Sequence, residues 1–300
     1  MGSLAMGRLA ALAAAAALVL LAAACGERSE PTGPQTGLYP VTVSSAAGGK
    51  PIVIRSPAKR IAVIAPSIQR ILVDLGARRT IAGAPLLQNG DVDKQRIRAL
   101  HPDLIVASAT TDDQTLRQAA HAVKGVPVYQ APDDSIRGVE ETITELGVIT
   151  ARQAAAARLV REIERKRALV HKQLRKAPTV GVFLATGFFP NIATFTTVSN
   201  QSLAGDLLGE THARNVVGDS AQAGPVDAHS LAQLEPEWIV ATNTSGITLA
   251  QLRKNKLTRK LRAVVAGRFA TVDGDLLEPG PTIGQGLLEL ARDLHPDAFR

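Results

Sequence analysis

Two similar nine-residue stretches, LHPDLIVAS at residues 100–108 and LEPEWIVAT at residues 234–242, lie 134 residues apart in the chain. Five of the nine positions are identical, and an acidic residue follows the proline in both. Because proline disfavours helix in the residue before it and is poorly tolerated inside a helix, each stretch begins at a helix end. The apolar run after the acid predicts a strand buried on both faces, followed by a loop that opens with a hydroxyl residue. The chain therefore contains two similar halves.

Further apolar runs alternate with helical patterns along the whole chain. The runs that predict strands are 61–65, 126–129 and 180–185, and helical periodicity covers 68–75, 114–123, 202–208 and 283–294. Strands that alternate with helices predict parallel sheets. Ligands of such sheets bind beyond the carboxyl ends of the strands. We therefore expect an α/β protein of two Rossmann-like lobes with parallel sheets and a ligand cleft between them.

Residues 151–174, between the two halves, contain no Gly or Pro and are rich in Ala, Arg, Glu, Lys and Leu. At ~1.5 Å per residue, a helix of this length reaches about 36 Å. A surface helix on one lobe is the alternative interpretation, but the position midway between the matched halves favours a connector. We expect a rigid helix over 151–175 that joins an N-terminal lobe, 41–150, to a C-terminal lobe, 176–300, and permits only small hinge motion.

The N-terminus is typical of a secretory signal. Arg8 precedes sixteen uncharged, Ala-rich residues, which are too few and too weakly apolar for a membrane-spanning helix. The only cysteine, Cys25, follows a run of small residues that resembles a bacterial lipobox, in which the cysteine is lipidated. A buried helix is the alternative. We predict a signal peptide over 1–24, then a lipidated Cys25 and a flexible Pro- and Gly-rich tether over 25–40.

Composition excludes several function classes. The net charge of +7 gives a weak preference for anionic ligands or anionic membrane surfaces. The chain has only nine aromatic residues, and no basic run is interleaved with them, which argues against nucleic-acid binding. The six His residues are spread singly without metal-ligand spacing, and the chain has neither a Gly-x-Ser-x-Gly elbow nor a phosphate-binding glycine loop. We expect a binding protein without a resident cofactor or metal, and not an enzyme.

Several short segments, in order along the chain, carry a family resemblance. Residues 39–43 and 57–63 look like opening strands, the two nine-residue stretches look like paired Leu-x-Pro-Asp strands, and residues 278–281 and 290–299 look like a closing segment. In this order and spacing they resemble the substrate-binding lipoproteins of ABC importers for iron-siderophores, haem and cobalamin. The resemblance implies two lobes joined by one long helix, with a ligand held between them and delivered to a membrane permease and its ATPase.

The resemblance does not by itself name the ligand, and we expect a ferric siderophore. We expect a monomer, anchored to the outer face of the cytoplasmic membrane by acyl chains such as palmitate, with no nucleic-acid partner. Cobalamin and haem stay open, although the family often lines its cleft with Trp and Tyr and the single Trp238 falls inside a predicted strand. A surface-tethered sensory or interaction protein that reuses the fold is the alternative from another class.

The first two candidate ligand contacts lie at the start of one predicted helix. Ser67 is predicted as the N-cap of a helix that begins at Ile68, and also as a ligand contact. Arg70 stands where the family usually has Glu, and a cation in the first helical turn opposes the helix dipole. We therefore predict that Arg70 faces the cleft and pairs with an anionic ligand group, the alternative being a solvated side chain.

Ser108 and Thr242 open the loops after the two matched strands. Because the strands are equivalent, we expect these hydroxyl groups on opposing walls of the cleft. Hydroxyl groups that only bond the nearby backbone are the alternative.

The remaining candidate ligand contacts are aromatic or adjacent to aromatic residues. Phe188 and Phe189 follow Gly187 and are expected in a loop, where such a pair is either core or a ligand platform. Asn191 is close to this pair, and Tyr129 ends a first-lobe strand.

Permease docking in the family relies on an exposed acid on each lobe, which meets Arg residues of the transporter. Asp91 and Asp93 lie in the corresponding segment of the first lobe. In the second lobe Arg214 occupies the place where many relatives have Glu, and Glu210 lies one turn earlier. The resemblance thus implies Asp91, Asp93 and Glu210 as docking residues. The Arg residues at positions 70 and 214 leave room for a divergent permease or for a protein that binds without importing.

Overall fold

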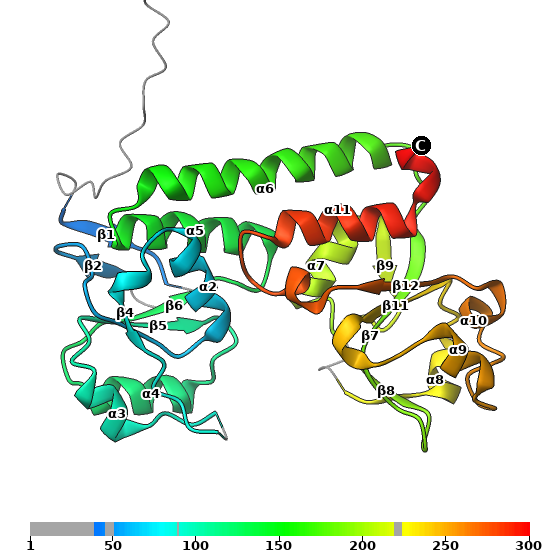
Figure 1. Cartoon of the computed structure of the whole chain (residues 1–300), viewed down its shortest axis with the longest axis horizontal. Helices are drawn as coiled ribbons and strands as arrows, with labels where there is room; N and C mark the ends of the chain where they lie inside the picture. Colours follow the sequence, from blue (N-terminus) through cyan, green and yellow to red (C-terminus); the bar gives the residue numbers. More distant parts are fainter. Residues whose placement is uncertain (1–38, 46–50, 89, 219–223) are drawn as a thin grey trace, which may run out of the picture. The chain divides into compact units, whose positions relative to one another are not determined.

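The computed structural model describes residues 39–45, 51–88, 90–218 and 224–300. The predicted signal peptide, Cys25 and most of the predicted tether lie outside the described residues. The described residues fall in one compact unit, which contains two lobes, each built on its own sheet (Figure 1).

The N-terminal lobe is built around a four-stranded sheet. Its elements are a hairpin of β1 (Val41–Val43) and β2 (Ile52–Ile54), then β3 (Ile61–Val63), α2 (Pro66–Asp74), η1 (Arg78–Thr80), β4 (Ile81–Gly83), α3 (Lys94–Ala99), β5 (Leu104–Ser108), α4 (Asp113–Ala122), β6 (Val128–Ala131) and α5 (Ile136–Ile149). The strand order is β4-β3-β5-β6, and every pair is parallel. The sheet is buried on both faces, because Ile61 and Val63 enter one hydrophobic cluster and Ala62 enters another.

The C-terminal lobe repeats this strand order and adds to it. Its elements are β7 (Val180–Phe189), β8 (Thr194–Thr197), α7 (Leu203–Glu210), β9 (Ala213–Asn215), β10 (Val226–Asp227), α8 (Ala228–Gln233), β11 (Trp238–Thr242), η2 (Asn243–Ser245), α9 (Leu249–Lys254), α10 (Arg262–Ala266), β12 (Phe269–Val272), η3 (Gly274–Leu277), α11 (Ile283–Leu294) and η4 (Pro296–Phe299). The parallel order β9-β7-β11-β12 corresponds to β4-β3-β5-β6.

One edge of the second sheet differs from the expected parallel arrangement. Strand β7 is ten residues long, and only its first three residues pair with β9. Its later residues turn back as an antiparallel hairpin with β8, which pairs in turn with β10. The sheet is therefore mixed, because β7 extends beyond its parallel neighbour on this edge.

The two matched stretches are equivalent in structure as well as in sequence. In both, the residue after the helix-capping leucine has a positive φ, 44° in the first stretch and 47° in the second. The Asp103 carboxylate accepts a hydrogen bond from Arg60 N at 3.0 Å, and the Glu237 carboxylate accepts one from Gly181 N at 3.1 Å. Each acid thus ties the start of a central strand to the start of its neighbour, β3 or β7.

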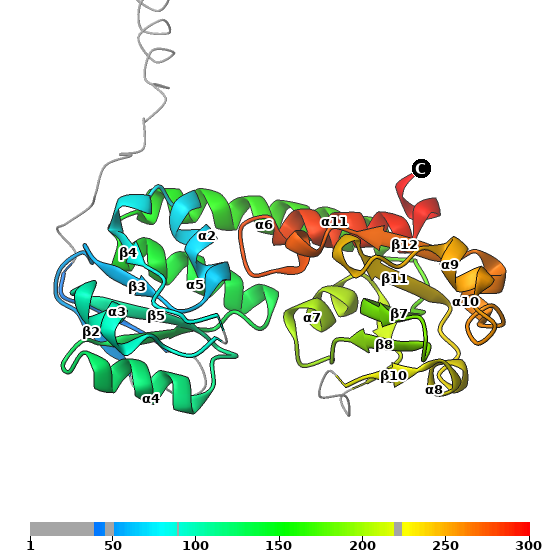
Figure 2. The same ribbon diagram turned by 60° about the horizontal axis from the view of Figure 1, so that its bottom comes forward.

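The predicted long helix is present as α6 (Gln153–Leu174). It packs on α5 of the N-terminal lobe near its start and on α11 of the C-terminal lobe further along (Figures 1 and 2). Ile163 and Val170 of α6 are fully buried. A Cβ placed on Gly284 of α11 would lie 3.1 Å from the Cα of Ile163, so the two helices pass close together there. In the described part of the chain, no helix combines the length and apolar character needed to cross a bilayer.

A single hydrophobic cluster runs through both lobes. It contains Val63 and Tyr129 of the first lobe, Val182 and Val240 of the second, and Ile163 of α6. The opposite face of each sheet is covered by a separate cluster. The lobes therefore share one core along α5, α6, α7 and α11.

We expect Ile163→Ala to lower the free energy of unfolding by about 2–5 kcal/mol, because the truncation leaves a cavity where α6 meets α11. Leu169→Ala on the same helix is the matched control, since Leu169 is 38% exposed and should change stability by less than about 1 kcal/mol. Urea unfolding followed by circular dichroism measures both. Equal losses in the two variants would contradict this account of the shared core.

Candidate ligand cleft

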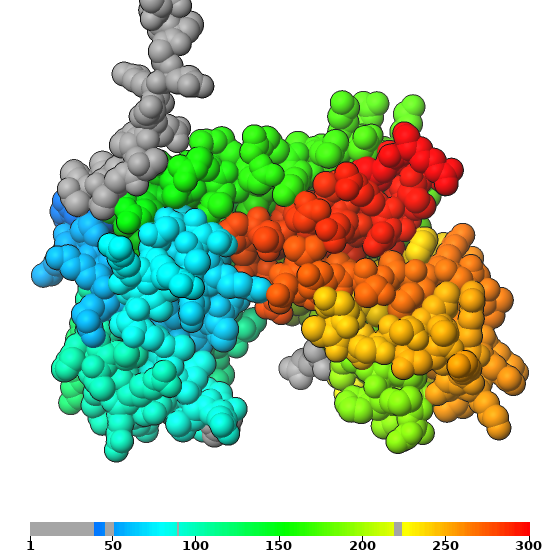
Figure 3. All heavy atoms as spheres, in the orientation of Figure 1, coloured from blue at the N-terminus to red at the C-terminus, as the bar shows by residue number. Residues whose placement is uncertain are grey.

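The carboxyl ends of the two parallel sheets carry most of the candidate site. Ser108 ends β5 in the first lobe, and Thr242 ends the equivalent strand, β11, in the second. In the space-filling view, α6 and α11 cover one side of both lobes, and a recess lies between the lobes on the other side (Figure 3).

The end of the first sheet is organised by Asp133, which sequence reasoning missed. Its Oδ1 accepts hydrogen bonds from Ser108 Oγ at 2.7 Å and from Ala109 N at 2.9 Å. Asp133 is 2% exposed, and its Oδ2 is buried without a hydrogen-bond partner. Burial raises the pKa of Asp133, although the bonds from Ser108 and Ala109 oppose the shift. The Ser108 hydroxyl thus donates its hydrogen bond to Asp133, and this bond fixes the orientation of the Ser108 side chain at the edge of the lobe.

The end of the second sheet forms a pocket of about 350 Å³. Its polar wall includes Thr186, Thr242 and Thr244 together with the carboxylates of Asp275 and Glu278. Its apolar lining consists of Leu184, Val198, Ala204 and Leu277. Hydroxyl and carboxylate groups above an apolar floor suit a polar ligand that offers hydrogen-bond donors.

The loops around this pocket are held by Asn243 and Asp273, two further residues that the sequence did not single out. Asn243 Nδ2 donates to Asp273 Oδ1 at 3.1 Å, and Asn243 Oδ1 accepts from Gly274 N at 3.1 Å. The same Asp273 oxygen accepts from Asp275 N at 3.1 Å. These bonds join the ends of β11 and β12 and place Asp275 at the rim of the pocket.

Arg70 is directed toward this rim. Its guanidinium lies 3.3 Å from the Asp275 carboxylate, so the ion pair joins α2 of the first lobe to η3 of the second. The two side chains are 43% and 79% exposed, and an exposed pair of this kind contributes about 0–1 kcal/mol. An anionic ligand group would therefore compete for Arg70 at small cost.

Ser67 does not cap its helix as predicted. Helix α2 begins at Pro66, its N-cap residue is Ala65, and no side chain caps it. The reason is that the fixed φ of proline suits the first helical position. Ser67 lies in the first turn beside Pro66 and is partly exposed.

Tyr129 is buried and so cannot contact a ligand in the cleft, contrary to the prediction. Its side chain is fully buried in the shared core, and its hydroxyl donates to Glu145 Oε2 at 2.6 Å. Burial raises the pKa of Tyr129, and the Glu145 carboxylate adds to the shift. The alternation along β6 points this residue at α5 rather than at the cleft.

The aromatic pair lies in a strand, not in the predicted loop. Phe188 and Phe189 end β7 and pair with β8, and Phe188 stacks on Phe195 with ring centroids 4.5 Å apart. Phe189 is 54% exposed, and Asn191 is exposed in the turn that follows.

The predicted docking acids differ in their surroundings. Asp91 is exposed, whereas Asp93 is the N-cap of α3 and accepts from Gln95 N at 3.0 Å and Arg96 N at 2.9 Å. Arg214 is exposed on β9. The prediction of Glu210 as an exposed docking acid is wrong, because its side chain is only 17% exposed and is held by α6.

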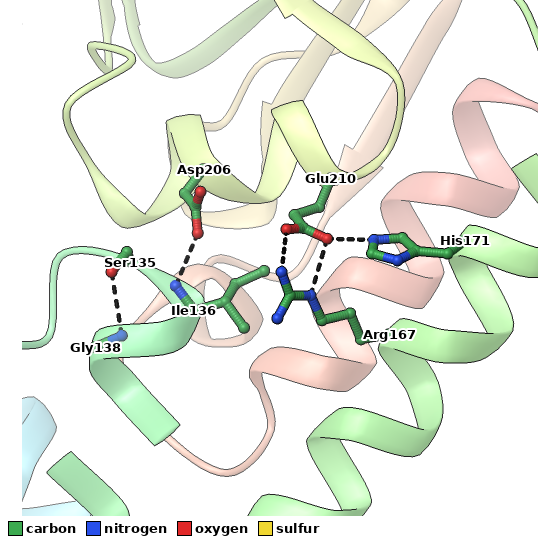
Figure 4. A network of polar contacts seen from close by, with 7 residues as sticks. All are labelled: Ser135, Ile136, Gly138, Arg167, His171, Asp206 and Glu210. Atoms are coloured by element: carbon green, nitrogen blue, oxygen red, sulfur yellow. Dashed lines mark hydrogen bonds and ion pairs between the residues drawn. The ribbon is translucent and has the colours of Figure 1, made fainter. Parts of the chain in front are cut away.

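Glu210 is part of a polar network between α7 and α6 (Figure 4). Its carboxylate accepts two hydrogen bonds from Arg167, at 2.5 and 3.0 Å, and contacts the His171 ring. Burial acts to raise the pKa of Glu210, but the bonds from Arg167 and His171 outweigh it and lower the pKa. In the same network, Asp206 Oδ2 accepts from Ile136 N at 2.8 Å. Helix α5 of the first lobe is therefore capped from the second lobe.

No three His, Cys, Asp or Glu side chains come together as a potential metal site within the ranges that the structure describes.

The two-lobed fold with a connecting helix is matched by a known protein family. The match, to the periplasmic binding protein family, covers residues 76–276 and so takes in β4, β5 and β6 of the first sheet and all the strands of the second. The chain belongs to this family. Its members are binding proteins and not enzymes, as the sequence predicts.

Similar proteins extend the comparison over nearly the whole chain. The uncharacterized ABC transporter substrate-binding lipoprotein YvrC of Bacillus subtilis strain 168 is 25% identical, covering 95% of this chain and 97% of its own. A possible iron-binding, periplasmic solute-binding protein of Staphylococcus epidermidis has a TM-score of 0.60 at 24% identity, with 79% of this chain and 99% of that one covered. CeuE of Helicobacter pylori, solved as a Ni-His complex, has a TM-score of 0.69 at 16% identity, with 88% and 90% covered. The two structures show the fold.

We expect Asp133→Ala to lower the free energy of unfolding by about 1–3 kcal/mol, because Ser108 Oγ and Ala109 N lose their acceptor. Asp133→Asn keeps an acceptor oxygen and removes the buried charge, so it should equal or exceed the natural protein in stability at pH 8. Since the pKa of Asp133 is raised on folding, its contribution is present below about pH 4 and is lost as pH rises through the folded pKa. Urea unfolding at pH 3.5 and pH 8 tests this. A stability gap between the Asn variant and the natural protein that does not widen with pH would contradict it.

For Arg167→Met we expect a loss of about 1–3 kcal/mol in the free energy of unfolding, because the mostly buried Glu210 carboxylate loses a charge-assisted partner. The pKa of Glu210 is lowered on folding, so this contribution is present above about pH 4.3 and is lost as pH falls through the folded pKa. Arg137→Met, at an exposed ion pair with Glu141, is the matched control and should have little effect. Thermal unfolding at pH 2.5 and pH 7 measures the difference. A loss at Arg167 that is unchanged at low pH would show that packing, not charge, is responsible.

Proposed function

We propose that the protein is the solute-binding lipoprotein of an ABC importer, which captures a ferric siderophore and delivers it to a membrane permease. The observation that carries this proposal is the family match over residues 76–276, which includes Ser108 of the first lobe and Thr242 of the second. The Bacillus subtilis relative, by its name a substrate-binding lipoprotein of an ABC transporter, supports the importer role. The Staphylococcus epidermidis structure, that of a possible iron-binding protein, supports an iron-containing ligand.

The arrangement of the cleft residues agrees with capture rather than catalysis. Arg70 offers a guanidinium to an anionic group of the ligand, and its partner Asp275 lines a pocket with Thr242. Ser67 and Ser108 lie on the first-lobe side. A ferric siderophore presents an oxygen-rich surface that accepts hydrogen bonds, and Arg70 and the hydroxyl groups can donate to it.

The proposed attachment is a lipid on Cys25, which lies outside the described residues. After removal of residues 1–24, the acylated Cys25 would hold the chain at the outer face of the cytoplasmic membrane. The residues that follow it, up to 40, span at most about 50 Å when fully extended. A tethered chain would therefore stay within reach of a permease in the same membrane.

A thermal-shift panel of ferric siderophores, haem and cobalamin tests the proposed ligand class. At a ligand concentration of about 100 Kd, binding adds about 2.7 kcal/mol, which raises the Tm by about 5–10 °C for a chain of this size. Arg70→Ala should reduce the shift caused by a ferric siderophore at fixed concentration, and Arg137→Ala should not.

The outcomes separate the parts of the proposal. A shift with haem or cobalamin alone would keep the family role and replace the ligand. No shift with any member of the panel would favour a tethered sensory or interaction protein. An unchanged affinity in Arg70→Ala would remove Arg70 from the site.

A further inference from the structure

The positive charge of the chain is concentrated in one segment of the C-terminal lobe. Residues 243–272 contain seven Lys and Arg and no Asp or Glu, whereas the net charge of the whole chain is +7. The formal charges of all the other residues therefore sum to zero. One of the seven, Arg268, pairs with Glu237 at 3.3 Å. The other six are exposed on α9, on α10 and on the loop between them: Arg253, Lys254, Lys256, Arg259, Lys260 and Arg262.

Large apolar side chains are exposed beside these cations. Leu257, in the loop between α9 and α10, is 63% exposed. At the tip of the β7–β8 hairpin, Phe189 is 54% exposed and Ile192 is 65% exposed. The hairpin and the loop are in contact, because Asn255 Nδ2 donates to Pro190 O at 3.2 Å. We call the six cations together with Phe189, Ile192 and Leu257 the basic apolar surface.

The loop that presents Leu257 is held in place by its own hydrogen bonds. Asn255 Oδ1 accepts from Leu257 N at 2.9 Å, and the buried Thr258 donates through Oγ1 to Leu252 O at 2.7 Å. Leu252 is itself fully buried. Leu257 therefore points outward from a loop that is anchored on both sides of it, which is the arrangement of an interaction surface rather than of a frayed segment.

We propose that the basic apolar surface lies against the anionic headgroups of a lipid bilayer. Cations attract acidic lipids, and each Lys or Arg near such a membrane strengthens binding about fivefold. Exposed aliphatic and aromatic tips enter the boundary between headgroups and acyl chains. A bilayer presents anionic headgroups directly above apolar chains, so it satisfies the cations and the three apolar tips together. The proposal rests on the proposed function only in that lipidation of Cys25 would keep this surface near a membrane.

The experiment uses the processed chain from residue 25 onward, with Cys25→Ser so that no lipid is attached. We expect it to sediment with vesicles of phosphatidylcholine containing 30% phosphatidylglycerol, and at least tenfold less with pure phosphatidylcholine. Binding should fall when salt is raised from 50 to 500 mM, because the shorter screening length weakens the attraction. A triple variant, Lys254→Gln, Lys256→Gln and Lys260→Gln, should lose at least tenfold in affinity.

A matched control removes the same charge elsewhere on the surface. Lys172→Gln, Arg175→Gln and Lys176→Gln change three exposed cations near the end of α6 and should leave vesicle binding within twofold. Leu257→Ser with Ile192→Ser should weaken binding without changing the net charge. In Leu257→Trp, the indole emission should shift to shorter wavelength with anionic vesicles only.

Equal losses in the two triple variants, or no preference for anionic vesicles, would overturn the proposal. So would sedimentation that the apolar variants do not weaken. The Lys254, Lys256 and Lys260 triple variant should keep the thermal shift caused by the ligand, so a failure of membrane binding is distinguished from a failure of solute binding.

Discussion

The hydrophobic cluster shared by the two lobes is the constraint on which the rest of the structure depends. Ile163 and Val170 of α6 are buried in the same core as the inner faces of both sheets. Separation of the lobes would expose this cluster, at about 25 cal/mol for each Å² of apolar area. The recess between the lobes therefore lies opposite a layer of packed helices.

Polar contacts add direction to this packing. Asp206 caps α5 across the lobes, and Glu210 is bound by Arg167 of α6 (Figure 4). Hydrogen bonds have angular requirements that apolar contacts lack, so these bonds select one arrangement of α5, α6 and α7 among those that the core alone would permit. On the cleft side, by contrast, the exposed pair of Arg70 and Asp275 is weak and replaceable. The molecule is firmly joined on the side of α6 and loosely joined at the candidate ligand site.

The matched stretches were enough to predict the two lobes, because a buried strand and its flanking proline are local features of sequence. Strand ends were predictable for the same reason, and Ser108 and Thr242 do end equivalent strands. Side-chain direction was not. Tyr129 lies in a predicted strand, but the sequence pattern there does not say which face of the sheet its side chain is on. The packing of α5 on that face is what buries it.

Hydrogen-bond partners that lie far apart in the chain could not be predicted from the sequence either. No sequence motif marks Asp133 or Glu210, and their roles depend on Ser108, 25 residues away, and on Arg167, 43 residues away. The resemblance placed Glu210 on an exposed docking surface, whereas the helix beside it turns that carboxylate inward. A family pattern assigns a position in the chain, but the neighbours of that position determine whether its charge is available.

The two sheets share a strand order, so the lobes differ in the helices and strands that lie between and beside the shared strands. Between β5 and β6 the first lobe has one helix, α4, whereas the second has η2, α9 and α10 between β11 and β12. Strand β8 is a further addition, and it pairs with the part of β7 that extends beyond β9. These additions carry the exposed cations and the apolar tips of Phe189, Ile192 and Leu257. The repeated core thus builds the walls of the candidate ligand cleft, and the elements specific to the second lobe give that lobe a surface of different chemistry.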